Sequence, residues 1–188
     1  MGLDMYLTRK IYVGANYNFN KITGTCCLKQ DGVKIPIDKN KIKYIEEDAG
    51  YWRKANQIHR WFVDNVQDGN DDCNSYSVSI KKLKELLDLC KEVKRIAIVE
   101  KSYIRNGERY VDGEWMPIYE EGCVIKNPEE IAKILPTQKG FFFGSSDYDE
   151  YYLEDINNTI EIIEKQIKRQ EELDANKTFS FLEYQSSW

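Results

Sequence analysis

The apolar residues of this chain follow two spacings, and the succession of these spacings constrains its fold most strongly. Leu3, Met5 and Leu7 alternate with polar residues, which is the period of a half-buried strand. Over residues 79–95 apolar residues instead recur every three or four positions, which is typical of an amphipathic helix. We therefore predict an α+β fold, with a small antiparallel or mixed sheet packed against about three helices in one domain spanning residues 1–188.

The turn-forming and helix-capping residues between these segments predict where the individual strands and helices begin and end. Turn dipeptides at 31–32, 106–107 and 112–113 indicate a hairpin over residues 25–37 and a small β-meander over residues 96–125. Further strands are expected at the start of the chain, at 41–45 and at 178–184, and the last of these is expected to pair with the first. The expected helices are 50–66 with Asp48 as N-cap, 79–95, a short one from Pro128 with Asn127 as cap, and 147–173 with Asp147 as cap.

Charge and composition exclude several classes of protein. The chain has 27 basic and 32 acidic residues and a net charge of −5, which argues against binding of duplex nucleic acid. No run of about 18 apolar residues and no leader-like segment occurs, so we expect neither a membrane span nor a signal peptide. The five cysteines are odd in number and lack a CxxC spacing, which favours packed thiols in a reducing, cytoplasmic compartment. Vicinal Cys26 and Cys27 would lie on opposite faces of a strand, and Cys90 falls on an apolar helical stripe.

Four segments together resemble one family. They are Met1–Leu7, the stretch YWRKANQIHRWFV at Tyr51–Val63, Asp71-Asp72-Cys73, and LPTQKGFFFGSSDYDEYY at Leu135–Tyr152. These segments are similar to a family of small uncharacterised bacteriophage and prophage proteins, and the similarity covers most of the chain except residues 96–125. The resemblance implies a phage or prophage product that acts in a bacterial cytosol, and it implies no catalytic residue.

His59 is the single histidine and the first candidate for catalysis. It could act with Cys73, or with Asp71 or Asp72, as the base of a small hydrolase-like enzyme. The alternative is a core histidine, because His59 lies on the apolar stripe of its helix. The chain shows no nucleophile motif and no phosphate-binding glycine loop, so we expect a protein without catalytic activity.

The loop Asp68–Asp72 is rich in oxygen ligands, but it lacks the residue order and closing glutamate of an EF-hand. Zinc would need a closer set of Cys and His ligands than His59 and Cys73 provide. We therefore expect neither a metal site nor another cofactor.

An aromatic and acidic segment at 141–150 is the most unusual part of the sequence. Seven acids and no Lys or Arg lie between Asp147 and Glu164. Such a segment suits a basic protein surface, or it consists of capping acids and core phenylalanines. If Arg53 or Lys54 faced this segment, the two would form a mixed pocket with aromatic walls, amide donors and one or two cations, which suits a nucleotide-like molecule. The candidate binding residues are Arg53, Asn56, His59, Phe142, Gly144, Ser145, Tyr148 and Tyr151.

These observations support three hypotheses about function. The first is a phage accessory protein that binds a host protein or a small nucleotide-like host molecule and interferes with host defence. The second is the hydrolase-like enzyme that uses His59. The third is a structural or assembly protein that forms a homodimer through the long helix at 147–173.

Overall fold

A computed structural model of the chain describes residues 2–14 and 27–188. Its central element is a four-stranded antiparallel sheet, which comprises β4 (Tyr44–Arg53), β1 (Asp4–Tyr12), β8 (Ser180–Ser187) and β5 (Tyr76–Val78) in this spatial order. The predicted pairing of the last strand with the first is confirmed, because β1 and β8 pair over their whole common length. The prediction about Cys26 lies outside the described residues.

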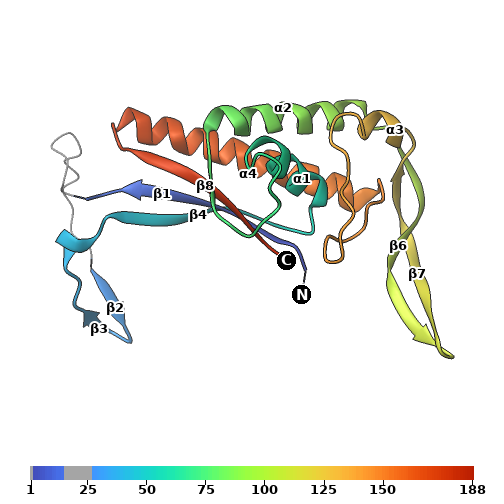
Figure 1. Cartoon of the computed structure of the whole chain (residues 1–188), viewed down its shortest axis with the longest axis horizontal. Helices are drawn as coiled ribbons and strands as arrows, with labels where there is room; N and C mark the ends of the chain where they lie inside the picture. Colours follow the sequence, from blue (N-terminus) through green and yellow to red (C-terminus); the bar gives the residue numbers. More distant parts are fainter. Residues whose placement is uncertain (1, 15–26) are drawn as a thin grey trace.

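Helices cover one face of this sheet, so the α+β prediction is confirmed. They are α1 (Asn56–Asn65), α2 (Ile80–Ile96) and α4 (Glu150–Ala175), and a one-turn helix α3 (Pro128–Ile131) follows the β-ribbon described below. Figure 1 shows α2 and α4 lying side by side over the sheet, with α1 in front of them. A short 3-10 helix (Lys39–Lys41) precedes β4, which begins at Tyr44 and not at residue 41.

The alternation of β1 sorts its side chains between the core and the solvent. Leu3, Met5 and Leu7 are buried under the helices, as predicted. On the opposite face Tyr6 is exposed, and Lys10 forms an ion pair with Glu183 of the neighbouring strand at 2.6 Å. The sheet thus has one apolar and one polar face, as is common for an antiparallel sheet packed on one side.

The predicted helix over residues 50–66 is wrong in its first part. Residues 50–53 belong to β4, where Trp52 pairs with Met5, and the chain then turns at Lys54 with a positive φ of 60°. Trp52 lies three residues before Ala55, which is a spacing typical of one helical face. It is buried, however, because it belongs to β4, where neighbouring side chains point to opposite faces and this one points into the core. A helix cannot continue through a left-handed residue, and α1 therefore begins only at Asn56.

The predicted meander is a single long β-ribbon and forms its own two-stranded sheet. Strands β6 (Val99–Val111) and β7 (Glu114–Ile125) are joined by the turn at Asp112-Gly113. Asn106-Gly107 is not a second turn, because the register of β6 shifts between Arg105 and Glu108 and the extra residues form a bulge. Figure 1 shows this ribbon extending away from the helices and the main sheet. The predicted hairpin around residues 31–32 is confirmed, with β2 (Leu28–Gln30) and β3 (Val33–Ile35).

The remaining helix predictions hold with shifted boundaries. Ser79 caps α2 by accepting from the Lys82 amide, and Cys90 is buried in the core as expected. The long helix is capped by Asp149 and not by Asp147, because the Asp149 carboxylate accepts from the amides of residues 151 and 152. The apolar side of α4 packs against α2 and the core. It is therefore not free to form the homodimer interface that was proposed for the long helix at 147–173.

Candidate ligand-binding cleft

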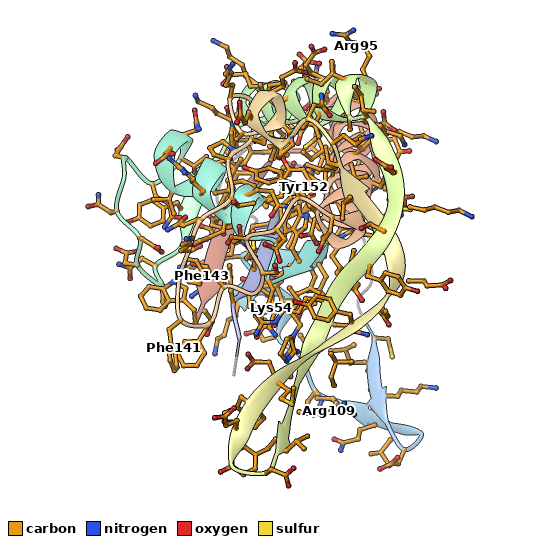
Figure 2. The ribbon with its side chains drawn as sticks, turned by 90° about the vertical axis from the view of Figure 1, so that its right-hand side faces the viewer. Lys54, Arg95, Arg109, Phe141, Phe143 and Tyr152 are labelled. Carbon is orange, nitrogen blue, oxygen red and sulfur yellow. The ribbon has the colours of Figure 1, made fainter. Side chains whose placement is uncertain are left out.

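A cleft of about 690 Å³ lies where the β-ribbon meets the body of the molecule. Its walls come from the end of β4, the first turn of α1, the bulge of β6, the loop at 137–147 and the first turns of α4. Figure 2 shows Lys54 and Tyr152, which both line this cleft, with the ribbon beside them. The volume falls in the range of roughly 300–1,000 Å³ that is usual for small-molecule sites.

One wall of the cleft is basic. Arg53 and Lys54 are consecutive residues at the end of β4, and both are exposed. The Arg53 guanidinium lies 4.0 Å from the Asp4 carboxylate, and Lys54 forms no ion pair with any residue in the described part of the chain. Lys54 holds a left-handed backbone conformation, which costs a non-glycine residue about 1–2 kcal/mol. Such strain is often retained where the side chain has a functional role.

The loop at 137–147 forms the adjacent wall and approaches Lys54 closely. Gly144 has a φ of 83°, and a Cβ added to it would lie 3.0 Å from the Cβ of Lys54. Only glycine fits both the backbone conformation and this contact. Gly144 and Ser145 therefore bring their main chain next to the basic wall.

Asn56 fixes the position of this loop from beneath. Its side-chain amide donates to the carbonyl oxygens of Phe143 at 3.1 Å and Ser145 at 2.7 Å, and its oxygen accepts from the Gln138 amide at 2.9 Å. The side chain is buried, and these three bonds use both its donors and its acceptor. Asn56 is thus a positioning residue for the cleft and does not line it.

The opposite wall is acidic and contains one unusual carboxyl group. Burial raises the pKa of Asp155 to about 7, against the smaller opposing effect of a hydrogen bond from Gln57 Nε2 at 3.1 Å. Burial likewise raises the pKa of Asp149, whose carboxylate caps α4. Glu154 lines the same wall and is exposed. The cleft therefore offers cations on one side and, near neutral pH, a partly protonated carboxyl on the other.

The β-ribbon closes the cleft from the outside. Its bulge supplies Arg105, which pairs with Glu108, and Gly107 with a φ of 102°. The base of the ribbon is tied to α4, because the Tyr151 hydroxyl donates to the Glu120 carboxylate at 2.5 Å. This hydrogen bond raises the pKa of Tyr151 to about 12.

The structure brings four of the predicted binding residues together in this cleft. They are Arg53, Gly144, Ser145 and Tyr151. Phe142 and Tyr148 instead pack against the core, and their main-chain oxygens accept from Leu3 and Ile125. The sequence reasoning missed Gln57, Asp155 and the residues of the β6 bulge. Asp155 lies one helical turn after Tyr151, and this spacing is the one signal that could have identified it.

His59 does not line the cleft, and of the proposed catalytic partners only Asp71 contacts its ring, in a buried position. Its side chain is 0 % exposed, and its ring nitrogens contact the Tyr184 hydroxyl at 2.8 Å and the Asp71 carboxylate at 3.0 Å. Burial lowers the pKa of His59, which favours the neutral ring that can accept from Tyr184 and donate to Asp71. This is the core histidine of the alternative interpretation.

The other catalytic candidates lie apart from the His59 ring. Cys73 is exposed, and the Asp72 carboxylate is occupied by the Asn74 amide at 3.0 Å and the Tyr76 hydroxyl at 3.0 Å. Among the described residues, no hydrogen bond joins His59 to Cys73 or Asp72. A hydrolase mechanism through these residues has no accessible base in this structure.

Within residues 2–14 and 27–188, no three His, Cys, Asp or Glu side chains are grouped so as to hold a metal ion. None of the helices in the same part of the chain is long and apolar enough to cross a membrane. Comparison of the chain with protein-family models, with curated proteins and with solved structures finds no match.

Proposed function

We propose that this chain is a non-catalytic phage or prophage accessory protein that binds a small nucleotide-like host molecule in the cleft. The genetic setting, the bacterial cytosol and the interference with host defence rest on the family resemblance of the four sequence segments. The choice of a small ligand rests on the cleft, because its volume suits a molecule of nucleotide size and a host protein would need a wider surface.

The observation that supports the proposal most directly is the meeting of Arg53 and Lys54 with the loop at Gly144-Ser145 in one cleft. The phosphate of a nucleotide needs cations and hydrogen-bond donors, and this corner supplies two cations beside the main chain of Gly144 and Ser145. The opposite wall supplies Gln57 and Asp155, an amide and a protonatable carboxyl that can meet the polar edge of a base. A ligand that carries an anion at one end and hydrogen-bonding groups at the other fits this arrangement.

The experiment is a calorimetric titration of the purified chain with a set of nucleoside mono-, di- and triphosphates, cyclic nucleotides and inorganic phosphate. We expect at least one nucleotide to bind, and Arg53→Gln and Lys54→Gln each to weaken its binding at least tenfold. The matched control is Lys168→Gln, which changes an exposed lysine on α4 far along the helix from the cleft.

Two outcomes would contradict the proposal. One is an absence of binding by every nucleotide in the set at millimolar concentration. The other is binding that Lys168→Gln weakens as much as Lys54→Gln does, because this result would show attraction by general charge and not by the cleft.

A further inference from the structure

The β-ribbon carries a row of aromatic side chains that the body of the molecule does not cover. Tyr103, Tyr110, Trp115 and Tyr119 are between 59 % and 67 % exposed. In the ribbon register Tyr110 lies opposite Trp115, and their rings are 5.3 Å apart. We call these four residues the aromatic face.

The alternation of β7 separates the aromatic face from the side of the strand that contacts α4. Trp115 and Tyr119 share one side of β7, whereas Met116, Ile118 and Glu120 share the other. Glu120 accepts from Tyr151 of α4, so the side of Glu120 faces the body. Figure 2 shows the far half of the ribbon, with Arg109, reaching beyond the helices.

An isolated two-stranded ribbon is only marginally stable in water, and it gains stability when one of its faces is packed. The base of this ribbon has such packing, because Ile104 is buried. The half beyond the bulge has none, since every residue from Glu108 to Tyr110 and from Glu114 to Tyr119 is exposed. A cover for the aromatic face would supply the missing contact.

We propose that this cover is the aromatic face of a second copy of the chain, packed face to face about a two-fold axis. The charge of the aromatic face favours a second copy over a charged partner. The register places Lys101 and Glu121 on this side of the ribbon, and Arg105 and Glu108 pair with each other at its edge. These charges cancel, so the face lacks the net charge that would attract nucleic acid or a strongly charged protein. A face that carries both positive and negative charges can contact an identical face, as a two-fold interface requires.

The area of the aromatic face is also sufficient for a dimer. Complete burial of one tyrosine or tryptophan removes about 150–250 Å² from water. At the observed exposures the four residues offer roughly 500 Å² on each ribbon, so two ribbons together bury about 1,000 Å², which is the lower limit for a specific interface. Pairing along the free edge of β6 is a weaker alternative, because the bulge between Arg105 and Glu108 interrupts that edge.

Sedimentation equilibrium between about 1 and 100 μM tests the proposal. We expect a reversible dimer, and we expect the double variant Trp115→Ser/Tyr119→Ser to raise its dissociation constant at least tenfold. The matched control is Met116→Ser/Ile118→Ser, which removes two exposed apolar side chains from the other side of the same strand and is expected to leave the dimer intact. Circular dichroism checks that both variants keep the fold, as their exposed positions lead us to expect.

A wild-type chain that stays monomeric at 100 μM would overturn the proposal. So would a dimer that the Met116→Ser/Ile118→Ser variant weakens and the aromatic variant does not. Neither outcome depends on a nucleotide, so the result is independent of the ligand proposed for the cleft.

Discussion

The carboxyl group of Asp155 allows the most direct test of the electrostatics of the cleft. Its pKa in the folded chain is about 7, against a usual value near 3.8, and the first cause is burial. The substitution Asp155→Asn removes the charge and keeps the shape, and its amide oxygen can still accept from Gln57. We expect this variant to be more stable than the wild type at pH 8 and nearly equal to it at pH 4.

The sign follows from proton linkage. Between about pH 4 and pH 7 the folded chain holds the proton of Asp155 and the unfolded chain has released it, so the wild type loses stability as the pH rises through this window. Above pH 7 both states are ionised and the loss is complete. One pKa unit corresponds to about 1.4 kcal/mol, so the shift of the Asp155 pKa limits the loss of folding stability to about 4 kcal/mol. Because the side chain is half-buried at the edge of an open cleft, we expect about 2 kcal/mol.

The measurement is urea denaturation followed by circular dichroism at several pH values from 4 to 8. The wild-type curve alone is not decisive, because the lowered pKa of His59 makes the fold lose stability as the pH falls below about 6.5, in the opposite direction. The difference between Asp155→Asn and the wild type isolates the carboxyl group, since both chains contain His59. Glu154→Gln is the control, because Glu154 is exposed on the same turn and a surface substitution usually changes stability by less than about 0.5 kcal/mol.

A stability difference that is the same at pH 4 and pH 8 would refute this reasoning. A destabilised Asp155→Asn variant at pH 8 would refute it more strongly, since it would show that the ionised carboxylate stabilises the fold.

Three further predictions test the backbone and the core. Because Lys54 has a positive φ, Lys54→Gly should be about 1 kcal/mol more stable than Lys54→Ala in urea denaturation, the reverse of the usual order for these residues in regular structure. A Cβ at Gly50 would lie 2.5 Å from Ile162 Cγ2, so Gly50→Ala should lower the free energy of unfolding by about 1–3 kcal/mol. Burial raises the pKa of the Cys90 thiol to about 12, so a thiol reagent at pH 8 should leave Cys90 unmodified in the folded chain and label it in urea, whereas exposed Cys73 should react in both states.

The sequence predicts the structure correctly where a local pattern alone determines it. The alternation of Leu3, Met5 and Leu7 identified β1 and its buried side, and Asp31-Gly32 identified a hairpin whose turn residues both have positive φ. The sequence predicts it wrongly where the spacing of a residue fits one type of secondary structure but the residue lies in another. Trp52 fits a helical stripe, and only its pairing with Met5 shows that it belongs to a strand.

The cleft could be predicted only in part, for a related reason. Arg53, Gly144 and Ser145 were found because they lie in segments of unusual composition. Asp155 was not found, because burial in the folded chain raises its pKa and its hydrogen-bond partner Gln57 is distant in the sequence. Pairing, burial and charge environment arise from tertiary contacts, and no local spacing encodes them.

The β-ribbon can couple ligand binding in the cleft to dimer formation through thermodynamic linkage. Its bulge lines the cleft with Arg105 and Gly107, and Arg105 lies opposite Tyr119 of the aromatic face in the register of the ribbon. If a ligand that contacts the bulge orders the ribbon, the ribbon loses less conformational entropy when a second copy packs on it. If a nucleotide strengthens the dimer by some factor, the dimer must bind that nucleotide more tightly than the monomer by the same factor. Titration of one nucleotide into the wild type and into Trp115→Ser/Tyr119→Ser therefore measures this coupling, and equal affinities in the two chains would show that the cleft and the aromatic face act independently.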